Sequence, residues 1–370
     1  MKEPMILQNS TTIPVTIIIP VYETAYIDFF ECMDSIAKQT KIPERIIVVD
    51  DGNSNPIYKD IVWDFAVRLK GKSKAELITL PTNCGISVAR NTGMWQVKTP
   101  WLSFVDSDDK LKENFSERLY EEVERDDSID IICCGCDAYD GYKYYQNHFY
   151  LGNRTFKGDS LIELEKMLID CKYARENTRC DTAIGVPWGK LYRASCISVK
   201  FDPKLKRMED NIWNHQLIKN NPDLVVKYID EPLYIYRTTH IRKYEDEYEE
   251  DISTWLYAIE QREKILQNSL AQDEELAKLY YNEVSRFVMF VAQKKFFHKD
   301  NPNRRESYKE LKEILGRKDI QMALDKTFEG LPIYRNTRNR FLRKGHFKLA
   351  YMLHVSRPTI ARLVKWVRGR

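Results

Sequence analysis

Carboxylates follow a predicted strand at a spacing that suits metal chemistry. The apolar run 101–105 is rich in aromatic and β-branched residues and leads directly into Asp106, Asp108 and Asp109. Such a run predicts a buried strand that delivers the acids to its carboxyl end. Carboxylates at positions i and i+2 can converge on one hard cation, which prefers oxygen ligands and relieves their mutual repulsion. An Asp-rich turn that merely caps the next helix accounts for the same residues equally well.

A second acidic pair, Asp50 and Asp51, follows the apolar run 44–49. Strand patterns at 15–21, 44–50, 75–80 and 101–106 alternate with helical patterns at 26–38, 60–69 and 86–97. This alternation predicts parallel βαβ units in a doubly wound α/β sheet. Because the carboxyl ends of such strands meet in one crevice, we expect these acids to be neighbours: Asp50, Asp51, Asp106 and Asp108.

The chain continues in the same style as far as about residue 240 and then changes. Beyond the fourth strand we expect helices at 113–125, 159–171 and 210–219, a strand at 129–136, an aromatic hairpin-like section at 139–150 and a strand pair at 224–229 and 233–237. From residue 245 the pattern is almost wholly helical. We therefore expect two domains, 1–244 and 245–370.

The bulk composition is that of a globular protein. The chain has 370 residues, of which 43% are hydrophobic and 31% charged, enough to bury a sizeable core and a second region. We find neither a signal-peptide pattern nor an apolar stretch of membrane-spanning length. The eight cysteines lack paired metal-ligand spacing, so we expect reduced thiols in a cytoplasmic protein. Cys133, Cys134 and Cys136 sit in a strand-like run and are expected in the core rather than on a metal.

Positive charge is concentrated at the end of the chain. Residues 330–370 contain eleven Lys and Arg and no acid, so the formal net charge of +3 leaves −8 on the rest. Within 359–368 a stripe of Ile, Leu and Val runs beside basic residues, which suits an amphipathic helix at an anionic membrane surface. A terminal helix packed on the core suits the pattern equally well. No nucleic-acid-binding module is visible.

Six motifs in order resemble the family 2 glycosyltransferases over roughly residues 13–240: 18–22, 48–52, 83–93, 104–109, 188–192 and 209–210. The helical remainder is outside this resemblance. The resemblance implies a GT-A fold, a Rossmann-like and mostly parallel sheet flanked by helices, here followed by an all-α C-terminal region. It also implies transfer of a sugar from a nucleotide donor, and it assigns the nucleotide pocket to Pro20, Val21, Tyr22, Glu23, Asp50, Asp51, Asn83, Gly85, Arg90, Asp106 and Ser107.

Two of these donor-site residues have competing interpretations. Asp51, with or without Asp50, would accept a hydrogen bond from the ring N–H of the base, or it would instead cap a helix. Arg90 would reach the pyrophosphate or the surrounding carboxylates, for which its planar multi-donor head is suited. An ion pair with Asp106 is the structural alternative, and it is compatible with the first role.

The resemblance also assigns the metal and the catalytic base. Asp106 and Asp108 match the Asp-x-Asp motif that holds Mn²⁺ or Mg²⁺ on the diphosphate, where the cation acts as a Lewis acid. His240 would be a further ligand, or a structural histidine. Family members of this type invert the anomeric centre in one displacement, which needs a carboxylate base. Asp210 is the first candidate for that base and Glu209 the second, the alternative for either being a partner of the helix dipole.

The acceptor side is assigned to Trp188 and Lys190. The Trp188 indole would offer a flat face to an acceptor sugar, unless it is simply buried. The expected activity is that of an inverting, metal-dependent enzyme, with UDP-sugar favoured as donor through the resemblance. The acceptor would be a hydroxyl of a glycan, lipid-linked or protein-linked, in bacterial surface-polysaccharide or glycoconjugate synthesis. The protein would be cytoplasmic. A peripheral position at the inner face of the membrane and a homo-oligomer are both compatible with the sequence.

The alternative to an enzyme is a non-catalytic nucleotide- or sugar-binding partner of another transferase. Intact acids at 106, 108 and 210 argue against it. A nucleotidyltransferase would want a Gly-rich, basic loop soon after the first strand, and residues 21–24 are neither.

Overall fold

The computed structural model describes residues 12–147, 149, 152–170, 184–238, 252–293, 298, 301–326, 333–353 and 356. The chain divides into two compact units, Met1–Ile241 and Arg242–Arg370. The predicted boundary between residues 244 and 245 lies outside the described residues.

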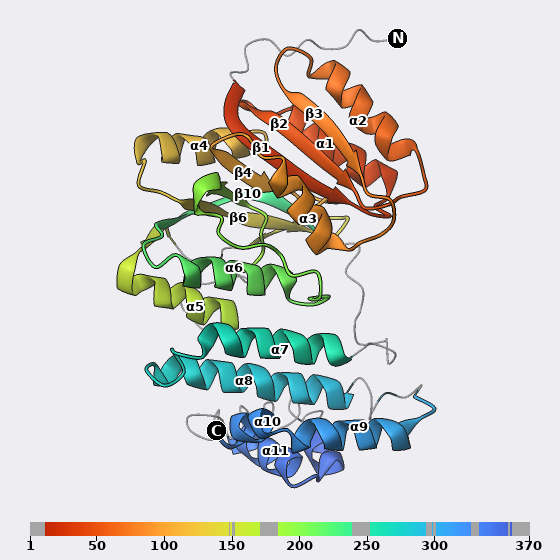
Figure 1. Ribbon diagram of the computed structural model, residues 1–370, viewed down its shortest axis with the longest axis vertical. Coiled ribbons are helices and arrows are strands. Elements are labelled where there is room, and N and C mark those ends of the chain that lie inside the picture. Colours follow the sequence, from red (N-terminus) through yellow and green to blue (C-terminus); the bar gives the residue numbers. More distant parts are fainter. Residues whose placement is uncertain are drawn as a thin grey trace, which may run out of the picture. The chain divides into compact units, whose positions relative to one another are not determined.

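The first unit is built on a ten-stranded mixed sheet with the path β3-β2-β1-β4-β9-β6-β10-β5 (Figure 1). Its first half is parallel and places four carboxyl ends side by side. Two of these strands, β1 and β2, are rich in β-branched apolar residues, and all but β3 are buried on both faces, as parallel strands between helices must be. They are β1 (Thr12–Val21), β2 (Ile42–Asp50), β3 (Lys74–Thr79) and β4 (Trp101–Phe104).

The second half of the sheet is mixed. β9 (Lys190–Arg193) runs antiparallel to both β4 and β6 (Ile131–Tyr139). β10 (Val226–Arg237) runs parallel to β6 and also carries two short antiparallel strands, β5 (Lys110–Leu111) and β8 (Arg154–Phe156). The expected aromatic hairpin is present, since β7 (Tyr144–Asn147) pairs back onto β6.

One expectation for this half of the sheet is wrong. The predicted pair of strands at 224–229 and 233–237 is a single strand, β10, whose register shifts on either side of Pro232. Proline has no N–H to give to the ladder, so it interrupts the pairing and produces an irregularity instead of a turn.

Helices flank the sheet, as the alternating pattern predicts: α1 (Tyr26–Ala37), α2 (Ile57–Arg68), α3 (Ile86–Trp95), α4 (Phe115–Arg125), α5 (Leu161–Ile169) and α6 (Glu209–Asn220). The α3 helix packs closely on β1 because Gly93 has no side chain. A Cβ there would come within 2.4 Å of Cγ2 of Ile18. This close packing brings the start of α3 to the carboxyl end of the sheet.

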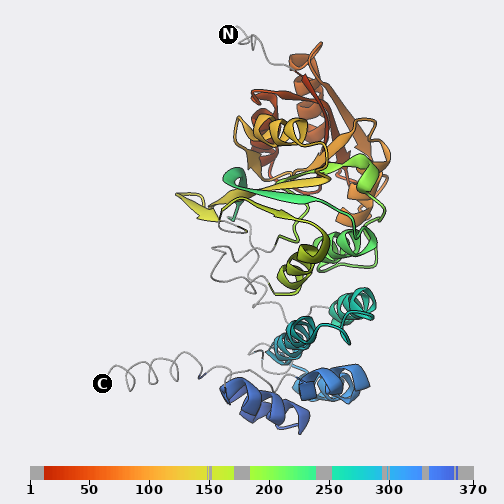
Figure 2. The same ribbon diagram turned by 90° about the vertical axis from the view of Figure 1, so that its left-hand side faces the viewer.

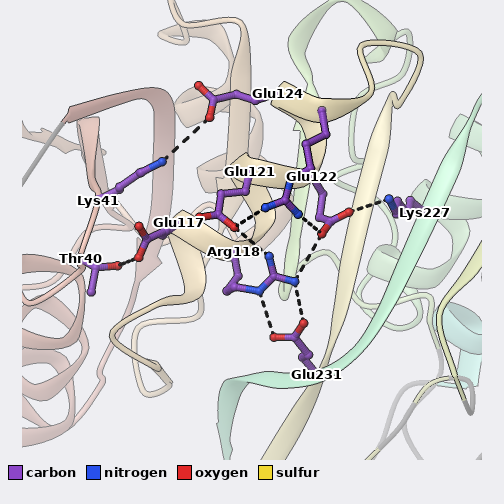
Figure 3. A network of polar contacts seen from close by, with 10 residues as sticks. Thr40, Lys41, Glu117, Arg118, Glu121, Glu122, Glu124, Lys227 and Glu231 are labelled. Carbon is purple, nitrogen blue, oxygen red and sulfur yellow. Dashed lines mark hydrogen bonds and ion pairs between the residues drawn. The ribbon is translucent and has the colours of Figure 1, made fainter.

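An ion-pair network joins α4 to β10 (Figure 3). Arg118 donates two hydrogen bonds to the Glu231 carboxylate, at 3.2 and 2.7 Å, and Lys227 lies 2.6 Å from Glu122. These contacts join the polar face of α4 to β10. The apolar face of the helix, with Phe115 and Leu119, is buried.

The cysteines of β6 behave as core residues. Cys133, Cys134 and Cys136 are fully buried free thiols, and burial raises the pKa of Cys133 to about 12. The prediction of core thiols is therefore confirmed for these three.

Every regular element described in the second unit is a helix, which confirms the all-α prediction for that part of the chain. Its helices are α7 (Ile252–Leu266), α8 (Glu274–Val291), α9 (Arg304–Gly316), α10 (Lys318–Lys326) and α11 (Ile333–Arg343). Asp273 caps α8 by accepting a hydrogen bond from the Leu276 N–H at 2.9 Å. Within the described ranges, no helix combines the length and apolarity needed to cross a membrane. The amphipathic segment 359–368 lies outside those ranges.

Candidate active site

A cleft opens at the carboxyl ends of β1, β2 and β4. Its volume is about 340 Å³. It gathers acids from two strand ends, which confirms that Asp51, Asp106 and Asp108 are neighbours. Eight of the eleven predicted nucleotide-pocket residues line it, together with Asp108 and the unpredicted Ile86 and Ala89. The full lining is Pro20, Val21, Tyr22, Asp51, Asn83, Gly85, Ile86, Ala89, Asp106, Ser107 and Asp108.

Asp51 shapes the floor of the cleft. Its buried carboxylate accepts hydrogen bonds from the Cys84 and Gly85 N–H groups, one on each oxygen and each at 2.8 Å. Gly85 precedes α3 with φ +92°, a conformation that favours glycine. Asp51 therefore fixes the loop that leads into α3, but it does not cap that helix, whose N-cap residue is Gly85 and which has no side-chain capping bond. Each carboxylate oxygen keeps a lone pair for a further donor.

Asp50 and Glu23 lie outside the cleft lining and build the turn beside it. The Asp50 carboxylate accepts from the backbone N–H of Asn53 at 2.9 Å and from its side-chain amide at 2.6 Å. Asn53 in turn accepts from the Glu23 N–H at 2.7 Å. Asn53 was missed by the sequence reading. Its signal is the Asp-x-x-Asn spacing around Gly52, whose φ is +82°.

A clamp from β10 holds the acidic loop. Asp109 is 1% exposed and accepts from the Tyr234 hydroxyl and the Arg237 N–H, both at 2.7 Å. Burial, with Asp106 and Asp108 nearby, raises the pKa of Asp109 well above its usual range. The Arg237 side chain donates to the Asp108 carbonyl at 2.7 Å. Asp109 therefore orients the loop and leaves the other two acids to the cleft.

The acids of this loop fit a divalent cation. Asp106 and Asp108 line one cleft, and burial, followed by the charges of these two acids, raises the pKa of the adjacent Asp109 carboxyl. Within the described part of the chain, no group of three or more His, Cys, Asp and Glu side chains converges as a metal site. His240 lies outside the described residues. The pair suits a hard cation that takes its other oxygen ligands from a bound diphosphate or water.

Arg90 links the cleft to the start of α6. Its buried guanidinium lies 3.1 Å from Asp106 and 3.4 Å from Glu209, so the predicted ion pair with Asp106 is confirmed. It also lies over the Phe201 ring, 5.3 Å from the centroid. Phe201 stacks on Trp213 at 4.4 Å. Neither aromatic residue was singled out from the sequence, because nothing local marks a ring that supports an arginine more than a hundred residues away.

The two candidate bases open α6. Burial and the neighbouring Asp210 raise the pKa of Glu209 to about 7, although the Arg90 contact acts in the opposite direction. Burial outweighs that ion pair because the 3.4 Å separation is long for one. Burial also raises the pKa of Asp210, against the effect of Arg90. Met208, immediately before the helix, has a left-handed φ of 60°, a strain of the kind found at functional sites.

Trp188 and Lys190 are buried instead of facing the cleft. The Trp188 indole is 3% exposed and stacks on Tyr234 at 4.3 Å and on Tyr236 at 5.3 Å. Lys190 donates to the Ile184 and Val186 carbonyls, and burial lowers its pKa to about 8. This geometry fits the structural alternative for Trp188 and gives neither side chain a free surface for an acceptor.

Comparison with known proteins agrees with this architecture. The family model described as glycosyl transferase family 2 matches residues 16–197. The chain is 31% identical over 227 residues to the uncharacterized glycosyltransferase EpsJ of Bacillus subtilis (strain 168), which covers 60% of each chain. It is 34% identical over 239 residues to the uncharacterized glycosyltransferase YibD of Escherichia coli (strain K12), 62% of each. The matches therefore span about three fifths of these relatives.

A solved structure shares the fold over most of the chain. The crystal structure of S. aureus TarS 1–349 in complex with UDP has a TM-score of 0.60 and 15% identity, and the likeness covers 93% of this chain and 91% of that one. At this identity the likeness shows the fold alone. The family match assigns residues 16–197 to glycosyl transferase family 2, and the structural likeness shows that the chain has the GT-A fold.

Proposed function

We propose that this protein transfers a sugar from a UDP-sugar to a hydroxyl of a glycan acceptor, lipid-linked or protein-linked, in bacterial surface-polysaccharide or glycoconjugate synthesis. The observation that supports the proposal is a row of ion-paired side chains that runs from the cleft to the start of α6. Asp106 in the cleft, Arg90 behind it and Glu209 at the helix start form one chain of ion pairs. The UDP bound in the TarS structure favours UDP as the donor nucleotide.

Donor binding would use the floor and the acidic side of the cleft. Asp51 is held in place by two backbone N–H groups and would accept from the ring N–H of the base. Asp106 and Asp108 would hold Mn²⁺ or Mg²⁺, and the bound cation would stabilise the negative charge of the departing nucleoside diphosphate. Arg90 would keep Asp106 oriented.

Transfer would be a single displacement. The acceptor oxygen forms a bond to the anomeric carbon while the bond from that carbon to the diphosphate oxygen breaks, so the configuration inverts. The acceptor proton passes to the carboxylate of Asp210, with Glu209 as the second candidate. Burial raises the pKa of both groups, to about 7 for Glu209, which favours uptake of a proton from the acceptor.

The basic segment 330–370 supports a peripheral position at an anionic membrane surface. The segment contains eleven basic residues and no acid of its own, although Arg343 pairs with Asp325 and Arg338 is buried. Each basic residue that reaches such a surface contributes about 1 kcal/mol of attraction. A lipid-linked acceptor would then be presented at the surface where the enzyme resides.

The test is release of UDP from a panel of UDP-sugars by the full chain with Mn²⁺. We expect turnover of one sugar that is abolished by chelator and by Asp108→Ala. A matched control is Asp64→Ala, which removes a half-exposed acid on α2 that pairs with Arg68 and lies outside the cleft. Asp210→Ala should keep metal-dependent UDP binding in calorimetry and lose transfer.

Two results would count against the enzyme. Metal-dependent UDP binding with no turnover, even with glycan acceptors added, would favour the non-catalytic partner. The proposal would fail outright if calorimetry detected no binding of any nucleotide in the presence of Mn²⁺.

A further inference from the structure

The hairpin of β6 and β7 carries a group of exposed tyrosines. Tyr142 at its tip is 96% exposed, Tyr144 53% and Tyr145 44%. Figure 2 shows the hairpin, in yellow, projecting beyond the rest of the sheet. Large aromatic side chains left in solvent as a group mark binding surfaces. We call Tyr139, Tyr142, Tyr144 and Tyr145 the tyrosine hairpin.

The tyrosine hairpin is held in shape before any ligand arrives. The Asp140 carboxylate accepts from the Tyr142 and Lys143 N–H groups, each at 3.0 Å, and from the Tyr145 hydroxyl at 2.9 Å. Tyr139 and Tyr144 stack with their centroids 4.7 Å apart. Rings that are already fixed lose little rotamer freedom when they bind, which favours affinity.

The hairpin is also continuous with the candidate active site. Tyr139 is the register partner of Arg237, whose guanidinium lies 6.0 Å from the Tyr139 ring. The same guanidinium donates to the Asp108 carbonyl at 2.7 Å. The Lys110 ammonium, which follows the acidic loop, lies 5.6 Å from the Tyr139 ring. The Tyr139 ring therefore lies between Tyr144 and Arg237, the residue that holds the acidic loop.

We propose that the tyrosine hairpin binds the pyranose rings of an oligosaccharide acceptor beside the transfer site. A pyranose presents an apolar C–H face and a rim of hydroxyls. A tyrosine matches it with a flat ring face and a phenolic hydroxyl. The proposal rests on the proposed function and gives its acceptor a chemical class, an extended saccharide. It also supplies the exposed aromatic surface that buried Trp188 does not.

Size and charge favour a saccharide over other occupants. Three tyrosine side chains expose a few hundred Å² at most, which is less than the about 800 Å² that each partner buries in a stable protein interface. The charges of Asp140 and Lys143 cancel, so the hairpin lacks the basic excess that attracts a protein to anionic lipid. A neutral ligand about as wide as one or two aromatic rings fits what remains.

The experiment measures saccharide binding by the full chain. Linear tri- to hexasaccharides of glucose, galactose and N-acetylglucosamine are screened by saturation-transfer NMR in the presence of UDP and Mn²⁺, and the Kd of each binder is determined. The variants are Tyr142→Ser, Tyr144→Ser and Tyr144→Phe. Trp63→Ser is the control, because Trp63 is 72% exposed on α2 and belongs to no part of the site. The Kd for UDP with Mn²⁺ is measured for every variant.

We expect Tyr144→Ser to weaken saccharide binding about tenfold or more, the loss of one stacked aromatic contact. Tyr144→Phe should bind nearly as well as the wild type because it keeps the ring, and Trp63→Ser should be unchanged. The UDP affinity should be the same throughout. Tyr142 is so exposed that Tyr142→Ser cannot disturb folding, so its loss of binding would report contact directly.

Two outcomes would overturn the proposal: no saccharide of the panel binds the wild type, or binding survives in both serine variants. Failure of the proposed function is a separate result, because it would appear as a wild type that does not bind UDP with Mn²⁺. If the wild type binds UDP and a saccharide, and the serine substitutions leave the saccharide affinity unchanged, the role proposed for the tyrosine hairpin is rejected and the proposed function stands.

Discussion

Replacement of Arg90 by alanine should destabilise the protein by an amount that increases with pH. Arg90 is 2% exposed and lies between two carboxylates, at 3.1 Å from Asp106 and 3.4 Å from Glu209. Removal of one partner of a buried ion pair costs about 3–5 kcal/mol, because the other charge is left without compensation. The Asp106 side chain is 26% exposed and the Glu209 contact is long. We therefore expect about 3 kcal/mol above pH 7, the low end of that range.

The pH dependence follows from the proton on Glu209. Its pKa is raised from 4.5 to about 7 by burial and by Asp210, and Arg90 is a group that lowers it. Between these values the folded protein keeps a proton that the unfolded chain releases, so this group's contribution to stability falls as pH rises through the window. Without Arg90 the pKa of Glu209 rises further, so the pH range over which the folded protein keeps this proton extends upward. The cost of the substitution should thus be about 1–2 kcal/mol at pH 5.5 and larger at pH 8.5.

The assay is thermal and urea unfolding of the wild type, Arg90→Ala, Glu209→Gln and the double variant at pH 5.5 and 8.5. In the double variant the neutral amide needs no counter-charge, so it should recover about half of the loss at pH 8.5. Arg68→Ala is a control, since Arg68 forms a surface pair with Asp64. An Arg90→Ala cost that is equal at the two pH values, or a double variant without recovery, would refute the electrostatic account of this bridge.

Three further substitutions test other parts of the site. Gly52→Ala should destabilise by about 2 kcal/mol or more and Gly71→Ala by much less. Both glycines have φ +82°, but a Cβ meets backbone at 2.3 Å only at Gly52. Equal changes in melting temperature would contradict this. Asp108→Asn should keep the wild-type melting temperature and lose Mn²⁺-dependent UDP binding in calorimetry. Tyr234→Phe should cost about 1–3 kcal/mol in urea unfolding, because buried Asp109 loses its 2.7 Å donor, and an unchanged midpoint would count against the clamp.

The sequence was sufficient for the parts of the fold that depend on local pattern. Apolar β-branched runs and helical spacing predicted the first four strands and the helices between them, because a period of two or 3.6 residues is visible in a short window. The acids after β2 and β4 were expected at one edge because parallel strands end there together. That expectation holds for Asp51, Asp106 and Asp108, which line one cleft.

The side chains that depend on distant partners were beyond a local reading. The partner of Asp50 proved to be Asn53 of its own turn, whereas Asp51 reaches the start of α3. Whether an indole is buried or exposed depends on the strands that cover it, so Trp188 could be read either way. The Arg237 clamp and the Phe201 support of Arg90 join residues more than a hundred positions apart, and neither has a local signature.

The clamp on the acidic loop has a consequence for how the protein is made. Asp109 receives both of its donors from β10, and its bond to the Arg237 N–H spans 128 positions. A ribosome that has synthesised the chain only as far as β9 has produced every acid of the cleft but neither of these donors. Contacts of such long sequence separation form late in folding. The acidic loop therefore acquires its final shape only after residue 237 has left the exit tunnel. A nascent chain that stalls earlier carries the acids of the cleft without the contacts that position them.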